Sequence, residues 1–263
     1  MITRSAQLAA RSDEDRVTTT DNTVIVLDGA TAHDPTTPQA GKYVDELGKQ
    51  LRQRVPSSDD LRAAVAQSIS ATSEQLHLIP GSSPSSTVAI VRVTADTVDL
   101  LVLGDSAVIV GTVDGNEHVH TDDRLASIDL PESRIYRERL STGAGYDDEH
   151  RALLQELQRA EGRQRNQPGG FWIAEADPTA ATHAFTSSYD RTEVAWAVAA
   201  TDGAFDLLPP LGISWRAVAK MTSPELRELL RRCHAWEAET DPEGQALPRA
   251  KRHDDKSVVV IYP

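Results

Sequence analysis

Four short acidic motifs in the sequence combine residue types that could bind divalent metal ions. They are Asp28-Gly29, Gly104-Asp105, Asp202-Gly203 and Asp254-Asp255. Carboxylate and backbone carbonyl oxygens are the ligands that Mg²⁺ and Mn²⁺ prefer, whereas zinc favours nitrogen and sulfur. A single Asp-Gly pair after an apolar run is usually only a turn. The repetition of such motifs, each beside an apolar run, is what indicates a metal site.

The apolar runs beside these motifs have the pattern of buried β-strands. Val24 to Leu27 is an unbroken run of apolar, mostly β-branched residues, which is typical of a strand buried on both faces. Further strands are predicted at 88–93, 97–103, 108–110 and 193–200, with a last one that ends at Tyr262. We expect the three strands between 88 and 110 to be successive and antiparallel, joined by short turns.

Carboxylates at the ends of strands can lie close together when those strands end at the same edge of a sheet. A cluster of this kind repels itself unless cations lie between the charges. Two divalent ions about 4 Å apart could neutralise it, activate a water and hold the attacking and leaving oxygens of a phosphoryl displacement. The motifs therefore indicate metal-dependent chemistry on a phosphate ester, without a histidine or cysteine nucleophile.

Several other parts of the chain have apolar residues at helical spacing. The predicted helices are 40–54, 58–78, 147–164 and those within 211–236. We expect residues 114–146 to be irregular, with helical turns. The polar segment 1–16 ends in a dense charge cluster, which is either a solvated turn or a group of carboxylates and arginines that supports a phosphate site.

The 263-residue chain has the composition of a folded globular protein, with a strong excess of negative charge. Its net charge of −13 argues against a nucleic acid or an anionic membrane surface as the main partner. Cys233 is the only cysteine, which excludes an intramolecular disulfide and a zinc site built from cysteines. Because the sequence shows neither a membrane-spanning run nor a secretory signal, we expect a cytoplasmic protein. We also expect a single domain, residues 1–263, and a monomer.

The acidic motifs resemble, in order, those of the PP2C-type (PPM) metal-dependent serine/threonine protein phosphatases of the bacterial branch. The matching segments are Glu14-Asp15, Leu27-Asp28-Gly29, Ser86-Thr87-Val88-Ala89, Leu103-Gly104-Asp105-Ser106, Ala200-Thr201-Asp202-Gly203 and Asp254-Asp255-Lys256-Ser257. The resemblance implies an α+β fold, a four-layer α-β-β-α sandwich with two central, mainly antiparallel sheets. It also implies that metal-activated water hydrolyses phosphoserine and phosphothreonine without a covalent phosphoenzyme.

The resemblance implies a set of metal ligands for two Mn²⁺ or Mg²⁺ ions. Asp28 is similar to the carboxylate that bridges both ions, and the Gly29 carbonyl to a ligand of one of them. Asp202 and Asp254 are similar to the ligands of the other ion. Asp105 is similar to the residue that, together with Asp202, supports a weaker third ion.

The resemblance also implies catalytic residues besides Asp28. Asp15, with Glu14 as a second candidate, would hold metal-bound water. Arg11 is the candidate phosphate clamp, because a guanidinium group binds two phosphate oxygens at once. Arg16 is the alternative, since the spacing from Arg11 to Asp15 is one residue shorter than in bacterial relatives.

The sequence departs from the family pattern at several positions. Ala30 stands where some relatives have a histidine that protonates the leaving group, and His33 is either a replacement or, more often for a lone loop histidine, a surface residue. Asp255 replaces the usual asparagine and is either a supporting ligand or, as we favour, an exposed capping carboxylate. The region 122–191 does not resemble the expected substrate flap, which leaves the choice of substrate open.

Three functional hypotheses follow. The first is a phosphatase that acts on phosphorylated proteins, with a serine/threonine kinase as a candidate partner. The second is a catalytically weak or silent relative that binds phosphoproteins as a regulatory module. The third is a phosphatase of small phosphate esters. The nearby cations Arg249, Lys251 and Arg252 either offset the acidic pair or steer phosphopeptides.

Overall fold

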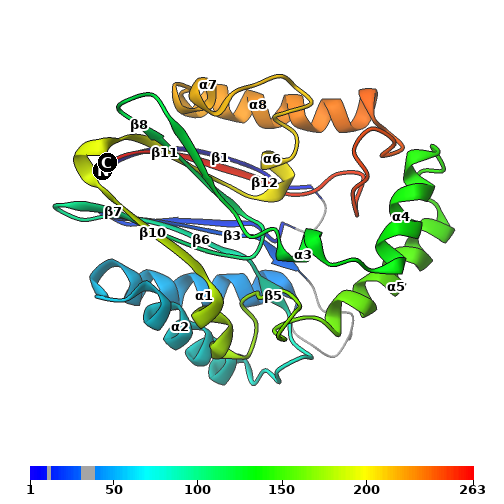
Figure 1. The fold of residues 1–263 in the computed structure, drawn as a ribbon, viewed down its shortest axis with the longest axis horizontal. Coiled ribbons are helices and arrows are strands. Elements are labelled where there is room, and N and C mark those ends of the chain that lie inside the picture. The colour runs from blue at the N-terminus through cyan, green and yellow to red at the C-terminus, as the bar shows by residue number, and fades with distance from the viewer. Residues whose placement is uncertain (11–12, 31–38) are drawn as a thin grey trace.

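The computed structural model describes residues 1–10, 13–30 and 39–263. Two five-stranded sheets lie face to face in the middle of the molecule, and helices cover both outer faces (Figure 1). The helices α1 and α2 lie on one outer face and α7 and α8 on the other. The predicted α-β-β-α sandwich with mainly antiparallel sheets is confirmed.

The chain contains the following elements. The strands are β1 (Ile2–Leu8), β2 (Arg16–Thr19), β3 (Thr23–Leu27), β4 (Gly29–Ala30), β5 (Ser85–Ser86), β6 (Val88–Val93), β7 (Thr97–Leu103), β8 (Ala107–Thr112), β9 (Glu117–His120), β10 (Phe185–Asp190), β11 (Val194–Ala200) and β12 (Lys256–Tyr262). The α-helices are α1 (Ala40–Arg54), α2 (Leu61–Leu76), α3 (Arg124–Ser127), α4 (Pro131–Ser141), α5 (Asp148–Gly162), α6 (Asp202–Phe205), α7 (Trp215–Ala219) and α8 (Ser223–Ala235). Short 3₁₀ turns are η1 (Val55–Ser57), η2 (Pro178–His183) and η3 (Arg191–Glu193), and η4 (Trp236–Thr240) is a π-helical turn.

The central strands are apolar along their whole length because both of their faces are buried. In β3, Ile25 and Leu27 pack against α1 and α2, whereas Val24 and Val26 pack between the two sheets. The strand β12 divides in the same way, with alternate residues facing α8 and the space between the sheets. This arrangement explains the unbroken apolar runs by which the sequence predicted strands.

The strand order is β1-β12-β11-β8-β9 in one sheet and β10-β7-β6-β3-β2 in the other. The prediction of three successive antiparallel strands between 88 and 110 holds within one sheet only for β6 and β7, because β8 pairs with β11 and β9 in the opposite sheet. The turn between β7 and β8 contains Gly104, whose φ of 83° lies in the left-handed region that favours glycine. This turn carries the chain from one sheet to the other.

Several elements were not predicted, and the longest of them are β1, β9, β10 and α4. The strand β1 lies in the polar segment 1–16 and pairs with β12 along its full length. The strand β10 pairs with β7, and its side chains are mostly exposed, so the sequence lacks the apolar signal of a buried strand. Residues 114–146, expected to be irregular, contain β9 and the 11-residue helix α4.

The helices α3, α4 and α5 lie at one end of the sandwich, and both chain termini lie at the opposite end (Figure 1). The helices α4 and α5 pack on each other through a small apolar cluster of Tyr136, Leu140 and Leu157. Among the described residues, none of the helices is long and apolar enough to cross a lipid bilayer.

Candidate active site

The pairing of the strands brings the acidic motifs to one edge of the sandwich. In one sheet, β3 and β7 both run antiparallel to β6, so Asp28 and Asp105 follow strands that end on the same side. In the other sheet, β11 ends where β12 begins, which places Asp202 beside Asp254. Asp15 precedes β2, which runs antiparallel to β3, and therefore lies next to Asp28.

The carboxyl groups of Asp28 and Asp202 are the centre of this edge. They are hydrogen-bonded to each other, although they belong to loops of different sheets. Burial, and then the charges of Asp202, Asp15 and Asp254, raise the pKa of Asp28 well above its ordinary value. Burial and the charge of Asp254 likewise raise the pKa of Asp202. The predicted juxtaposition of Asp28, Asp202 and Asp254 is therefore present.

Asp15 is buried beside this pair and is only partly satisfied. Its Oδ2 accepts a hydrogen bond of 2.9 Å from the Thr201 hydroxyl, and Ser257 also donates to the carboxylate. Its Oδ1 has no hydrogen-bond partner among the residues that the structure describes. Burial, with the charges of Asp202 and Asp255, raises the pKa of Asp15 to about 7.

Asp105 lies at the same edge, on the side that faces α3. Burial raises its pKa to about 7, with further contributions from the charges of Asp202, Asp206 and Asp122. Asp206 is the residue after α6. Burial and the charge of Asp202 raise its pKa to about 6. Asp206 was not predicted as a site residue, because it lies inside a helical turn rather than at the end of an apolar run.

Two buried threonine hydroxyl groups help to position Asp28 and Asp15. The Thr87 hydroxyl accepts a hydrogen bond of 3.1 Å from the Asp28 amide and lies 2.6 Å from the Ser106 hydroxyl. In the other sheet, the Thr201 hydroxyl bonds to Asp15 and accepts from the Ser257 amide at 3.0 Å. These residues were not predicted as site residues, although they stand within or beside the acidic motifs, and that adjacency was the available signal.

Gly203 allows the two ligand loops of the second sheet to come together. A Cβ atom at this position would lie 2.1 Å from the Asp255 carbonyl oxygen, a distance that no side chain can occupy. The amide of Gly203 donates to Asp202 Oδ1 at 2.5 Å. The Asp-Gly pair at 202–203 is therefore needed for close packing as well as for its carboxylate.

Asp255 is not an exposed capping carboxylate, which corrects the interpretation that we favoured. It is only 3% exposed, and its oxygens accept hydrogen bonds of 2.6 Å from the amides of Ala10 and Glu14. It thus fastens the segment before β2, which carries Asp15, to the start of β12. A carboxylate can do this where an asparagine would supply only one acceptor oxygen.

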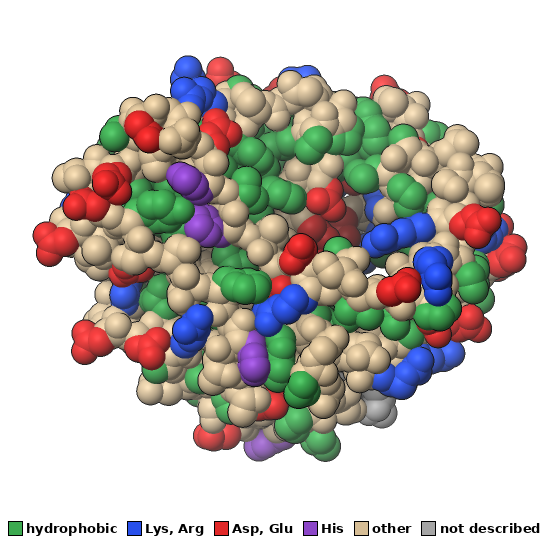
Figure 2. Space-filling view, viewed as in Figure 1, with side chains coloured by type: hydrophobic (Ala, Val, Ile, Leu, Met, Phe, Trp, Pro, Cys, Tyr) green, Lys and Arg blue, Asp and Glu red, His purple; other side chains and the backbone are tan. Residues whose placement is uncertain are grey.

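A cleft of about 160 Å³ opens onto the carboxylates, and Asp202, Asp206, Lys251 and Asp254 line part of it. Figure 2 shows acidic side chains gathered in a hollow near the middle of this face, with Lys and Arg side chains beside it. The Lys251 ammonium donates to Asp254 Oδ1 at 2.9 Å, and the charges of Asp254, Asp28 and Glu14 raise its pKa. Lys251 is thus one cation that partly offsets the acidic cluster.

Of the two candidates for the phosphate clamp, Arg16 is the one that the structure describes. Arg16 donates to Asp45 Oδ1 of α1 at 2.6 Å and to the carbonyl oxygens of Asp13 and Asp15 at 2.8 Å. These contacts hold its guanidinium against α1. Arg11 and His33 lie outside the described residues.

The carboxylate set fits divalent cations. The charges of Asp202 and Asp15 raise the pKa of Asp28, and the charge of Asp202 raises that of Asp15. One buried oxygen of Asp15 is unpaired in the described part of the chain. A buried acidic cluster with an unsatisfied oxygen is unfavourable unless positive charge enters it. All of its side-chain donors are oxygens, which is the chemistry of an Mg²⁺ or Mn²⁺ site rather than a zinc site.

Comparison with known proteins gives independent information on fold and family. A sequence model of the protein phosphatase 2C family matches residues 9–128. The serine/threonine phosphatase Stp1 from Staphylococcus aureus has a similar structure, with a TM-score of 0.58 at 12% identity over 99% of this chain and 94% of Stp1. No curated protein sequence matches the chain significantly.

Two further solved structures cover almost the whole chain. The PPM Ser-Thr phosphatase MsPP from Mycobacterium smegmatis, in complex with cacodylate, gives a TM-score of 0.54 at 19% identity, over 100% of this chain and 98% of MsPP. The catalytic domain of the serine threonine protein phosphatase PstP, in complex with two manganese ions, gives a TM-score of 0.54 at 16% identity. That match covers 98% of this chain and 95% of the PstP domain.

Proposed function

We propose that this protein hydrolyses phosphoserine and phosphothreonine in proteins. Residues 9–128 match a sequence model of the protein phosphatase 2C family, and the whole chain has the fold of bacterial PPM phosphatases. The observation that carries the proposal is the meeting of Asp28, Asp202 and Asp254 at one edge of the sandwich. Residues 1–263 act in this proposal as one phosphatase domain.

The proposed ligands of two Mn²⁺ or Mg²⁺ ions are Asp28, Gly29, Asp202 and Asp254, and Asp105 would support a third ion. Bound ions would supply the positive charge that draws the phosphate in and lowers the pKa of the attacking water. A PstP structure that holds two manganese ions supports this choice of metal.

The protein's own groups then position the reactants. Asp28 and Asp202, fastened by hydroxyls and by close backbone packing, present a rigid pair of carboxylates from the two sheets. We propose that Asp15, whose Oδ1 has no hydrogen-bond partner among the described residues, accepts a proton from water in the site. We propose Arg11 as the phosphate clamp, because Arg16 is engaged by Asp45 and by backbone carbonyls.

Hydrolysis of p-nitrophenyl phosphate with and without Mn²⁺ tests the proposal, since a silent binding module would release no nitrophenol. We predict that Asp202→Asn lowers the manganese-dependent rate more than about 100-fold while the circular dichroism spectrum is kept. The matched control is Asp21→Asn, which removes a carboxylate in the exposed turn between β2 and β3, at the opposite end of those strands. Equal rates for the two variants would overturn the assignment.

A panel of phosphopeptides and phosphorylated metabolites separates the two enzymatic hypotheses. A protein phosphatase should show the higher kcat/KM on phosphoserine or phosphothreonine peptides, because contacts along the peptide add to those with the phosphate. A preference for the metabolites would replace the proposal with a phosphatase of small esters.

A further inference from the structure

A second, larger cavity of about 550 Å³ lies beside the cleft. Ala250 and Lys251 line both spaces, so the two are adjacent along the loop before β12. The cavity lies between this loop, the segment before β2 and the helix α5. Its volume is in the range of pockets that hold an organic ligand or several amino-acid side chains.

The charge of this cavity is opposite to that of the chain as a whole. Its lining includes three cations, Arg151, Lys251 and Arg252, and no aspartate or glutamate among the described residues. The chain carries 40 acidic residues and has a net charge of −13, so a pocket without a carboxylate is a distinctive local feature. A pocket of this kind attracts anions against the field of the whole molecule.

The cations differ in how firmly they are held by neighbouring residues. Arg249, on the same loop, is held by Asp241 Oδ2 at 2.6 Å and by backbone carbonyls, so its role is structural. Arg252 is exposed, and its guanidinium has no hydrogen bond or ion pair with the described residues. Arg151 is also exposed and pairs only with Asp148, its neighbour on α5, in the described part of the chain. Arg252 is therefore available to an incoming anion, and Arg151 can exchange its exposed partner Asp148 for one, because exposed ion pairs are weak.

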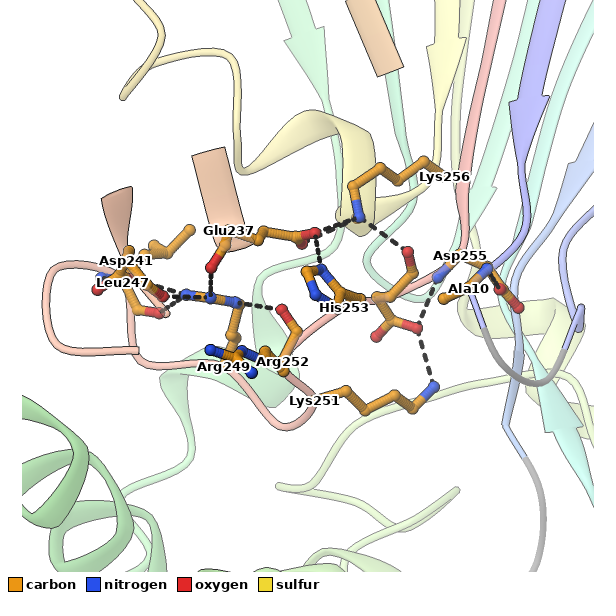
Figure 3. Close-up of polar contacts among 12 residues, drawn as sticks. Ala10, Glu237, Asp241, Leu247, Arg249, Lys251, Arg252, His253, Asp255 and Lys256 are labelled. Carbon is orange, nitrogen blue, oxygen red and sulfur yellow. Dashed lines mark hydrogen bonds and ion pairs between the residues drawn. The ribbon is translucent and has the colours of Figure 1, made fainter. Parts of the chain in front are cut away.

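The wall that presents Arg252 is firmly supported. Figure 3 shows Glu237 contacting both Lys256 and His253, with Lys256 reaching the backbone of the loop. The Lys256 ammonium, fully buried, donates to both Glu237 oxygens at 2.9 Å and to the Asp254 carbonyl at 2.8 Å. His253 bonds to Glu237 at 2.9 Å. These contacts fix the backbone of the loop, which lines the cleft on one side and the cavity on the other.

The rest of the lining is apolar or aromatic. Ala9, Ala10 and Leu154 contribute aliphatic surface, and Tyr146 and His150 contribute rings that pack edge to face at 4.8 Å. Such a lining suits the hydrocarbon part of a long side chain, while the cations at the edge suit its charged end. A bare inorganic anion would gain nothing from this apolar surface.

We propose that this cavity binds acidic side chains that flank the phosphorylated residue of a protein substrate. The proposal rests on the proposed phosphatase function and adds a preference for acidic phosphopeptides. If a phosphate is held at the carboxylate edge, the adjoining peptide lies next to Lys251. Lys251 lines both the cleft and the cavity, so the next residues of the peptide reach the cavity. Arg252 and Arg151 would then pair with glutamate or aspartate within a few residues of the phosphothreonine.

The test uses phosphothreonine peptides in which a Glu-Glu pair is moved from three residues before to three residues after the phosphothreonine. Each is compared with its Gln-Gln counterpart in the full-length protein with Mn²⁺. We expect at least one position to raise kcat/KM about fivefold, the size that two partly exposed ion pairs can provide. The charge reversal Arg252→Glu, alone and with Arg151→Glu, should remove or invert this preference.

The matched control is Arg227→Glu, the same charge change on the exposed face of α8, which should keep the preference. Equal kcat/KM values for the Glu-Glu and Gln-Gln peptides at every position would overturn the proposal, as would an equal loss in Arg227→Glu. A cavity that binds only small organic anions would show inhibition by them without a peptide preference, which also overturns it.

The two proposals fail in different ways. Loss of the phosphatase function appears as no manganese-dependent release of nitrophenol by the wild type. Binding of fluorescent acidic and neutral phosphopeptides, measured by anisotropy, does not need turnover. Acidic peptides that bind no more tightly than neutral ones to the wild type would refute the cavity proposal alone.

Discussion

At the scale of single residues, the site is a set of acids that burial holds in an unfavourable environment. Asp15 shows this most clearly, because it is 3% exposed, has one unpaired oxygen in the described structure and faces the charges of Asp202 and Asp255. Hydrogen bonds from Thr201 and Ser257 lower its pKa but do not cancel the effect of burial. Such a destabilising arrangement of buried carboxyl groups is expected where the protein binds a cation.

This arrangement makes the stability of the metal-free protein depend on pH. The pKa of Asp15 rises from 3.8 in the unfolded chain to about 7 in the folded one, so the folded state binds this proton more tightly. The carboxyl group is therefore neutral and harmless at low pH and destabilises the fold increasingly as pH rises from 3.8 to about 7. Asp15→Asn removes this titration.

We predict that in EDTA the stability of Asp15→Asn, relative to the wild type, increases by about 2 kcal/mol between pH 5 and pH 7.5. Urea unfolding at several pH values measures the difference. Asp21→Asn, in an exposed turn, serves as the control and should show no such trend. A difference for Asp15→Asn that stays constant with pH would contradict the explanation.

At the scale of elements, the acidic residues lie directly at the ends of strands. The strands therefore position these residues without long loops. Asp202 is the first residue of α6, directly after Thr201 at the end of β11, and Asp255 immediately precedes β12. The backbone of Gly203 lies against the Asp255 carbonyl, which joins the start of α6 to the start of β12. The distance between the predicted ligands Asp202 and Asp254 therefore depends on the absence of a side chain at Gly203.

Gly203→Ala tests this dependence. The added Cβ would lie 2.1 Å from a backbone oxygen, so α6 and β12 must move apart, at a cost of about 2–4 kcal/mol. Because both Asp202 and Asp254 move with these elements, Mn²⁺ affinity should fall as well.

The control for this prediction is Gly162→Ala at the end of α5, where a Cβ would meet nothing within 4 Å. That variant should be neutral or slightly more stable, since alanine favours helices. Thermal unfolding and manganese titration measure both effects. Wild-type stability and affinity in Gly203→Ala would show that the loops tolerate separation.

At the scale of the whole molecule, the site lies across the two halves of the sandwich. Asp28 and Asp105 come from one sheet, and Asp202 and Asp254 from the other. A cation held by Asp28 and Asp202 together would join the sheets at the edge far from the termini. Metal binding should therefore stabilise the complete fold rather than one loop.

We predict that saturating Mn²⁺ raises the midpoint of thermal unfolding. At a concentration about 100 times the dissociation constant, the stabilisation should be about 2.7 kcal/mol for one site, because only the folded state brings the ligands together. In Asp202→Asn the increase should be much smaller. An equal increase in this variant and in the wild type would place the binding elsewhere.

The sequence by itself determined the strands and the acids beside them. Runs such as Val24 to Leu27 must be buried on both faces, and this local requirement identified β3, β6, β7, β11 and β12 without knowledge of their partners. The edge strand β10 and the polar strand β1 lack this signal, so they were missed. Family resemblance supplied the expected sandwich and the candidate ligands.

Only the tertiary structure decided which strand ends share an edge. Asp15 meets Thr201, and Asp255 meets Glu14, across 186 and 241 positions of sequence. No local pattern encodes such contacts, because they depend on strand pairing and on the turn at Gly104 that moves β8 into the other sheet. The cavity beside Lys251 arises in the same way, from segments that are brought together only when both sheets and α5 are packed.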